Sequence, residues 1–227
     1  VLAAKSVNPQ VVFHTDASQA VGKIATDVKK MEVDFLTVAG HKLYAPKGIG
    51  ALYMRKGSPE IEPLMHGASH ESGRRAGTEN VLLAVGLGKA CELAHRSLTE
   101  RMRHMAACRD RLEREIVSEM ESFQPGCVRV NGDKKRRLPN TLSISFKSLN
   151  SHDILSTIQS KLACSAGSAC HSNEVRVSRV LQAMNVPSEF AKGTLRLSTG
   201  VHTTDLEITQ AVAIVCGAVK ETLKQGK

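Results

Sequence analysis

The amino-acid sequence predicts an α/β fold, with a larger mixed-sheet body followed by a smaller α/β body. Short apolar or β-branched runs bounded by Gly, Pro and Asp predict buried strands, and they alternate with stretches in which apolar residues recur at helical spacing. A chain of 227 residues, 41% of them apolar, has enough apolar side chains for a sizeable core. We therefore expect an ordered protein made of two parts.

The first part of the chain carries the signals of the larger sheet. Its apolar runs are residues 11–13, 35–38 and 49–54, and we expect them to form strands whose ends carry a site. After Asn80, apolar residues continue at helical spacing, and a second amphipathic stripe begins at Met105. Both stripes fit a long helical connector.

The second part of the chain predicts the smaller α/β body. Strand-like runs lie at residues 127–130, 141–146 and 194–197. Ser151 opens a helix with one apolar face, and Thr204 and Glu207 have the spacing of a capping box, which predicts the start of a final helix. We place the two domains at residues 1–92 and 93–227.

The charge balance is basic, with a formal net charge of +9 and an isoelectric point near 9.4. There is no Trp, only 3% of the residues are aromatic, and Lys and Arg are dispersed among acidic residues. The densest basic run, residues 134–137, stands between turn residues, which predict an exposed loop. We expect a solvated basic surface and no nucleic-acid partner, and keep a nucleic-acid module as the minor alternative.

The cysteine pattern argues against a disulfide framework and a structural zinc site. The six cysteines, at positions 91, 108, 127, 164, 170 and 216, form neither a CxxC pair nor the Cys/His spacing of a zinc ligand set. The sequence also has no run of about 18 apolar residues and no signal-peptide pattern. We expect a soluble, intracellular protein without a membrane anchor, and the choice among cytoplasm, mitochondrion and plastid stays open.

Five short motifs carry residue types suited to chemistry. They are His14-Thr15-Asp16-Ala17-Ser18-Gln19, Gly40-His41-Lys42, the Arg-Ala-Gly-Thr-Glu-Asn run at 75–80, the small-residue run with Cys170 at 165–171, and Leu195-Arg196-Leu197-Ser198-Thr199-Gly200. An Asp after a strand is usually a turn or a helix cap, and a Gly-His-Lys triplet is usually a loop, so each signal is weak when taken alone. Their order and spacing carry the argument.

Together these motifs resemble the cysteine desulfurase and selenocysteine lyase family, class V of the fold-type I pyridoxal phosphate enzymes. The likeness runs from about residue 11 to about residue 223. It implies the C-terminal part of the large mixed-sheet domain, residues 1–92, followed by the connector helix and the small C-terminal α/β domain. Because the chain begins at Val1 and soon reaches a motif that the family carries midway, we expect a fragment that lacks the N-terminal part.

The cofactor implied by the resemblance is pyridoxal 5′-phosphate, and two of its ligands also follow from chemistry. Lys42 offers the amine that binds the cofactor aldehyde, and Asp16 offers a carboxylate for the protonated ring nitrogen. Because Asp16 ends a very apolar strand, its charge would be poorly hydrated unless a cation paired with it. The resemblance assigns Gln19 to the phenolic oxygen of the cofactor and His41 to its phosphate. It implies no metal site.

Thr78 and Ala39 add two further expectations from the resemblance. Thr78 stands in a loop that crosses to the neighbouring subunit and offers its hydroxyl to that subunit's phosphate, which implies a homodimer. Ala39 stands where many members have a phosphate-binding serine. Selenocysteine lyases have an apolar residue there, which is a mild hint towards that branch.

The sulfur chemistry is assigned to Cys170 and Arg196. Small residues before Cys170 and polar residues after it predict an accessible thiol on a mobile loop, while Cys91, Cys108, Cys127 and Cys216 are expected to be buried apolar fillers. The planar guanidinium of Arg196 can bind both oxygens of a substrate α-carboxylate. In the desulfurase case, the Cys170 thiolate takes the substrate sulfur as a persulfide and L-alanine is released.

We therefore predict a pyridoxal phosphate enzyme that removes sulfur or selenium from L-cysteine or L-selenocysteine and gives L-alanine. The resemblance also implies transfer of the chalcogen to acceptor proteins, as in iron–sulfur cluster assembly. A different class V enzyme, such as an aminotransferase or desulfhydrase in which Cys170 is dispensable, is the second hypothesis. A non-catalytic scaffold fragment is the third, because no phosphate-cradling turn or ring-stacking histidine is found in the sequence.

Overall fold

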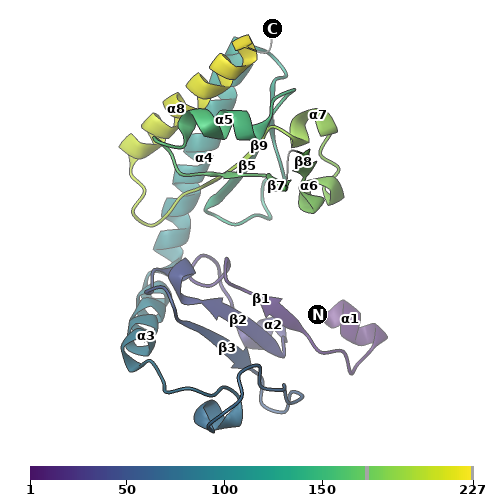
Figure 1. Ribbon diagram of the computed structural model, residues 1–227, viewed down its shortest axis with the longest axis vertical. Helices are drawn as coiled ribbons and strands as arrows, with labels where there is room; N and C mark the ends of the chain where they lie inside the picture. The colour runs from purple at the N-terminus through teal and green to yellow at the C-terminus, as the bar shows by residue number, and fades with distance from the viewer. Residues whose placement is uncertain (172–173, 226–227) are drawn as a thin grey trace. The chain divides into compact units, whose positions relative to one another are not determined.

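The computed structural model describes the backbone of residues 1–171 and 174–225, and the side chains of these residues except 168–171, 174–176 and 225. The chain divides into two compact units, Val1–Glu100 and Arg101–Lys227 (Figure 1, purple to blue and teal to yellow). The predicted boundary between residues 92 and 93 lies earlier, inside a helix. Among the described residues, no helix is both long enough and apolar enough to cross a membrane.

The first unit contains a small mixed sheet. Its elements in chain order are α1 (Leu2–Val7), β1 (His14–Asp16), α2 (Val28–Met31), β2 (Phe35–Ala39), the 3-10 turn η1 (Gly40–Leu43), β3 (Gly50–Met54), the 3-10 turn η2 (His70–Gly73) and α3 (Val81–Arg96). The strand order is β1-β2-β3, with β1 parallel and β3 antiparallel to β2. The predicted mixed sheet is confirmed.

The first strand begins later than predicted, at His14 instead of Val11. The backbone N–H of Phe13 donates to the side chain of Asp34, and the Phe13 carbonyl accepts from the N–H groups of Asp34 and Phe35. The ladder with β2 then pairs His14 with Phe35 and Asp16 with Thr37. Residues 11–13 therefore lead into the sheet, and the register places Asp16 at its edge.

The second unit is a smaller α/β body. Its elements are α4 (Leu98–Phe123), β4 (Val128–Val130), β5 (Thr141–Phe146), α5 (Ser151–Ile158), β6 (Ser165–Ala166), β7 (Ser168–His171), β8 (Glu174–Val177), α6 (Arg179–Ala183), α7 (Ser188–Ala191), β9 (Thr194–Ser198) and α8 (Asp205–Gln225). An antiparallel sheet has the order β4-β5-β9-β6, and β7 and β8 form a separate hairpin. The predicted connector consists of two helices: α3 ends just before Ser97, and α4 begins just after it.

The core of the second unit lies between this sheet and three helices. The inward face carries Leu142, Ile144, Leu195 and Leu197, and α4, α5 and α8 cover it with their apolar faces. α4 and α8 run beside each other, which the Lys220–Glu119 ion pair supports (Figure 1). Because side chains alternate along a strand, the opposite face is left to polar residues.

Candidate functional site

Asp16 and Lys42 follow the carboxyl ends of two neighbouring parallel strands. Asp16 ends β1 and pairs with Thr37 of β2, and Lys42 lies in the turn that begins directly after β2 ends at Ala39. In α/β sheets, ligands bind beyond the carboxyl ends of parallel strands. The structure thus brings the segments that carry Asp16, Gln19, His41 and Lys42 to one edge of the sheet.

Asp16 is exposed, so the prediction that its charge would be poorly hydrated was wrong, and Ser18 stabilises the charged form. The carboxylate Oδ1 accepts hydrogen bonds from the Ser18 hydroxyl and, at 2.9 Å, from the Ser18 backbone N–H. These two bonds, the hydroxyl first, lower the pKa of Asp16 below its ordinary value of 3.8. Asp16 is therefore an ionised, accessible carboxylate that can face a cationic ring.

The turn that carries His41 and Lys42 can be built only around a glycine. A Cβ on Gly40 would lie 2.7 Å from the carbonyl oxygen of Ile49 and 3.2 Å from the Ala45 side chain. The Gly40 N–H donates to the Ile49 carbonyl, and Tyr44 closes the turn in the left-handed conformation with φ of 73°. His41 and Lys42 are exposed on this turn.

His14 and Gln19 flank Asp16 on either side. Gln19 is exposed in the helical turn that follows β1, where Ala20 and Val21 donate to the Ala17 carbonyl. His14 lay outside the predicted site, as a residue of the outer face or of local packing. Its Nε2 lies 2.8 Å from the Thr37 hydroxyl, so it supports the strand pair beside Asp16.

Lys23 was missed by the sequence reasoning. It is a buried lysine whose Nζ donates to the backbone carbonyl of Lys42 at 2.9 Å. This bond joins the segment after β1 to the turn after β2. The sequence offers one faint signal, a lysine within the apolar run Val21-Gly22-Lys23-Ile24.

Thr78 lies in the loop before α3, in the same unit as Asp16 and Lys42. The loop is shaped by the Ala76 N–H, which donates to the Met65 carbonyl, and by Gly77, whose φ is +107°. Thr78 is exposed. An exposed hydroxyl here fits the expected role at a neighbouring subunit, which remains a prediction.

Arg196 belongs to the second unit, on the polar face of its sheet. It pairs with Ser143 of β5 and Ser165 of β6, and its Nη2 lies 3.4 Å from the Ser165 hydroxyl. The guanidinium is exposed, and among the described residues no carboxylate lies within ion-pair distance of it. Arg196 therefore has donors left for an anion.

Cys170 lies in a strand, so the prediction of a loop was wrong for its backbone. β7 pairs Cys170 with Val175 and His171 with Glu174 of the antiparallel strand β8. The side chain of Cys170 lies outside the described residues, as does the segment 172–173. The expected thiol exposure thus stays a prediction.

The small-residue run before Cys170 packs against protein. A Cβ on Gly167 would lie 2.6 Å from the Thr194 methyl group, and the Gly167 N–H donates to the Thr194 carbonyl. Gly167 therefore lets the strand approach β9 closely. The run fixes where β7 starts relative to Arg196, two residues beyond Thr194.

The other described cysteines are Cys108, Cys127 and Cys216, which are buried, Cys164, which is partly buried, and Cys91, which is exposed. Cys108, Cys127 and Cys216 are buried, and burial raises their pKa, to about 12 for Cys216. Their thiols stay protonated and act as the predicted apolar fillers. Cys91 is exposed, and its predicted burial was wrong because it lies on the open face of α3.

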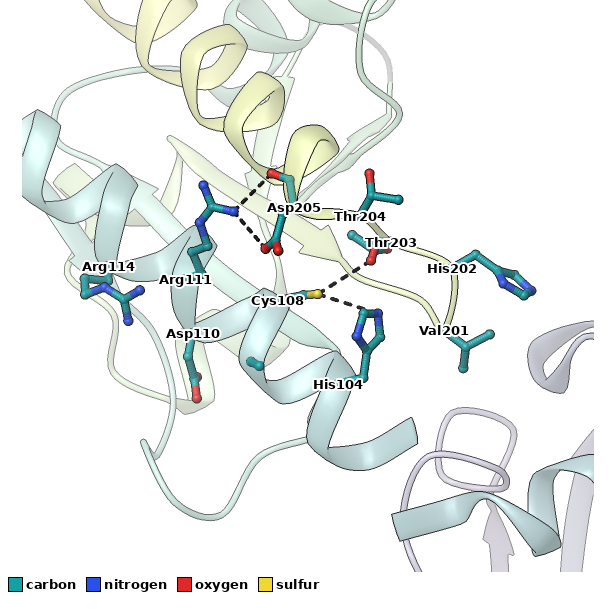
Figure 2. Close-up of a pocket in the computed structure, with 11 residues that line it drawn as sticks. His104, Cys108, Asp110, Arg111, Arg114, Val201, His202, Thr203, Thr204 and Asp205 are labelled. Carbon is teal, nitrogen blue, oxygen red and sulfur yellow. Dashed lines mark hydrogen bonds and ion pairs between the residues drawn. The ribbon is translucent and has the colours of Figure 1, made fainter. Parts of the chain in front are cut away.

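A pocket of about 740 Å³ lies between α4 and the start of α8, but it holds none of the predicted site residues (Figure 2). Cys108 lies 3.7 Å from His104 Nε2 and 3.7 Å from the Thr203 carbonyl, and its raised pKa makes it a poor nucleophile. Arg111 is held by Asp205 and Glu115. These contacts are structural, and no group of His, Cys, Asp and Glu in the described part of the chain forms a metal site.

The residues at the sheet edge fit pyridoxal phosphate by their chemistry. Asp16 is an anion held ready for a protonated ring nitrogen, and the exposed Lys42 amine has no hydrogen-bond or ion-pair partner among the described residues. An amine and a carboxylate beyond two adjacent strands suit a flat aldehyde with a basic nitrogen. His41 adds a donor for a phosphate group.

Comparisons with known proteins show which proteins this chain resembles. The model of the aminotransferase class-V family matches residues 2–210. A cysteine desulfurase from Gluconacetobacter diazotrophicus is 42% identical over 219 residues, which are 96% of this chain and 53% of the relative. A solved NifS-like protein is 31% identical with a TM-score of 0.80, over 96% of this chain and 54% of its own.

A further solved structure, SspA in complex with cysteine, is 29% identical with a TM-score of 0.60, over 89% of this chain and 54% of its own. The chain thus spans about half the length of the relatives it matches.

Proposed function

Because the chain belongs to the class V aminotransferase family, we propose that it is the part of a cysteine desulfurase that carries the cofactor lysine. It has the fold-type I architecture expected from its sequence. The observation that carries the proposal is that an accessible carboxylate, Asp16, and an exposed amine, Lys42, both lie at the carboxyl ends of the neighbouring strands β1 and β2. The relatives named above supply the reaction class. The activity of the whole protein is part of the proposal.

The residues at the sheet edge hold the cofactor and handle the substrate proton. When bound, pyridoxal phosphate draws electrons from the substrate α-carbon. Lys42 would hold the cofactor through its aldehyde, and its amine would accept the substrate α-proton. Asp16 keeps a proton on the ring nitrogen, because an adjacent carboxylate favours the cationic form. Gln19 donates to the phenolic oxygen and His41 to the phosphate.

The second unit supplies the groups that hold the substrate and accept its sulfur. Arg196 binds the α-carboxylate of L-cysteine through its planar guanidinium. The Cys170 thiolate then attacks the substrate sulfur, so that an S–S bond forms as the C–S bond breaks. L-Cysteine and the Cys170 thiol thus give L-alanine and a Cys170 persulfide.

The finer assignments rest on the family pattern. Thr78 serves a second copy of the chain in a homodimer, and the persulfide passes to a sulfur acceptor protein. Ala39 stands in place of a phosphate-binding serine, and for this reason L-selenocysteine is an alternative substrate. The initial rates with L-cysteine and L-selenocysteine, measured side by side, decide between the two.

Trapping of the cofactor tests the role of Lys42. We expect borohydride reduction of the chain with pyridoxal phosphate to fix the label on Lys42 in preference to other lysines, as mapped by peptide mass spectrometry. Lys42→Ala removes this label, and the matched control Lys47→Ala, another exposed lysine of the same loop, retains it. Equal labelling of all exposed lysines would instead favour the scaffold hypothesis.

Sulfur transfer tests the role of Cys170. After incubation with pyridoxal phosphate and L-cysteine, we expect the peptide that contains Cys170 to gain the mass of one sulfur atom. Cys170→Ala abolishes both this adduct and sulfide release in the presence of a reductant, whereas Cys91→Ala, at the exposed cysteine of α3, changes neither. Undiminished turnover in Cys170→Ala would assign the chain to the other class V reactions.

A further inference from the structure

Lys23 is a buried cation directly beneath the turn that carries Lys42. It is only 6% exposed, in the helical turn that follows β1, and its Nζ donates to the Lys42 carbonyl at 2.9 Å. Among the described residues, no carboxylate lies within 4.0 Å of this ammonium. Burying a charge without a counter-ion is unfavourable, so its presence calls for a reason beyond filling space.

The electrostatic surroundings of Lys23 also disfavour its charged form. Burial, and then the positive charge of Lys42, lower the pKa of Lys23 below its ordinary value of 10.5. An apolar side chain of similar length would avoid this cost. What such a side chain would lack is a hydrogen-bond donor at its end.

The Lys42 carbonyl needs such a donor because of the sequence that follows it. In a continuing helix it would accept from residue 45 or 46, but the Ala45 N–H donates to the Gly40 carbonyl and Pro46 has no N–H. No backbone N–H of the described residues donates to this oxygen. Lys23 supplies the missing donor at the end of the turn.

The segment around Lys23 also packs against the turn. Gly22 has a φ of +76°, and a Cβ placed there would lie 3.3 Å from the Leu43 side chain. Val21 packs in the same apolar cluster as Leu43 and Ala45. Residues 21–23 therefore contact the turn through side chains and a hydrogen bond, and Gly22 makes the close approach possible.

We propose that Lys23 is a positioning residue for Lys42, which fixes the backbone of the Gly40–Leu43 turn and so directs the Lys42 side chain to the sheet edge. This inference rests on the proposed function only where it takes Lys42 as the cofactor lysine. The contact itself is a property of the chain without cofactor.

The test compares Lys23→Met, which keeps the length and removes the donor, with Lys30→Met, a matched change at an exposed lysine. We expect the Tyr44 and Ala45 amides, which both donate to the Gly40 carbonyl, to exchange hydrogen about tenfold faster in Lys23→Met, with β2 unchanged. Borohydride-fixed pyridoxal phosphate on Lys42 should fall severalfold in the same variant. Lys30→Met should match the unmodified chain in both measurements.

The outcomes separate this inference from the proposed function. A folded Lys23→Met chain with unchanged exchange at residues 44 and 45 overturns the inference. Should Lys23→Met not fold, acylation of the unmodified chain decides: Lys23 labelled as fast as Lys30 would show that it is not buried and bonded. If the unmodified chain fixes no cofactor on Lys42, the proposed function fails, while hydrogen exchange still tests the contact.

Discussion

Ser18 sets the electrostatics of the candidate site through two hydrogen bonds to one carboxylate oxygen of Asp16. The same bonds order the first residues after β1, where the chain leaves the sheet. Because they stabilise the ionised carboxylate, they lower the pKa of Asp16. One small residue thus stabilises the charged form of Asp16 and orders the backbone that follows it.

Ser18→Ala should raise the pKa of Asp16 towards 3.8, since the first and largest cause of its lowering, the hydroxyl hydrogen bond, is lost. The folded-state pKa lies below the unfolded-state pKa, so the stabilisation from Asp16 is present above the unfolded value and fades as the pH falls through the folded value. The variant should lose part of this pH dependence. Carboxyl carbon NMR titration measures the pKa, with Ser6→Ala, a distant exposed serine, as the control. An unchanged titration would contradict the role of Ser18.

Strand β9 depends on a glycine at its entrance. A Cβ on Gly193 would lie 2.2 Å from the Phe146 carbonyl and 3.0 Å from the Leu149 carbonyl, and both of these atoms belong to the backbone. The Phe146 N–H also donates to the Gly193 carbonyl. The close approach of these segments therefore fixes where β9, and with it Arg196, enters the sheet.

Gly193→Ala should lower the free energy of unfolding of the second unit by about 3 kcal/mol or more, because backbone atoms must move to admit the methyl group. Gly217→Ala is the matched control. Gly217 is exposed within α8 and nothing lies near its Cβ position, so the change should raise helix stability by about 1 kcal/mol. Urea unfolding followed by far-UV circular dichroism measures both changes. A neutral Gly193→Ala variant would refute the packing argument.

The start of α8 shows how well a local signal predicts an element. Thr204 N–H donates to the Glu207 carboxylate, and the Glu207 N–H donates to the Thr204 hydroxyl, which confirms the capping box. The hydrogen bonds from Thr204 also lower the pKa of Glu207. A cap needs only residues three apart, so the sequence contains all of its information.

The chain as a whole carries a net charge of +9, yet its densest basic run is partly neutralised. Arg137 lies 2.6 Å from Glu113, and Arg136 lies 3.6 Å from Asp133. Asp133 also accepts from the backbone N–H groups of Lys135 and Arg136, so the run is folded into a turn. This arrangement favours a solvated loop over a nucleic-acid surface.

We expect no binding of a fluorescent oligonucleotide, single- or double-stranded, at physiological salt. Nonspecific binding through phosphates requires a clustered set of free cations, and its affinity falls steeply as salt rises. Fluorescence anisotropy at several salt concentrations makes the measurement, with Lys134→Glu as the comparison variant. Micromolar affinity with a steep salt dependence, lost in Lys134→Glu, would revive the nucleic-acid alternative.

The sequence by itself determined the α/β class, the second and third strands of the mixed sheet, the start of the last helix and the candidates Asp16 and Lys42, because periodicity, caps and motif order are local properties of the chain. Tertiary structure alone decided the rest. The bond from Lys23 to Lys42, the packing of Gly167 against Thr194 and the strand that holds Cys170 join residues whose contacts depend on register. The alternation of apolar residues indicates which face of a strand is buried, but which segments come together and in which register also depends on packing between segments that are distant in the sequence.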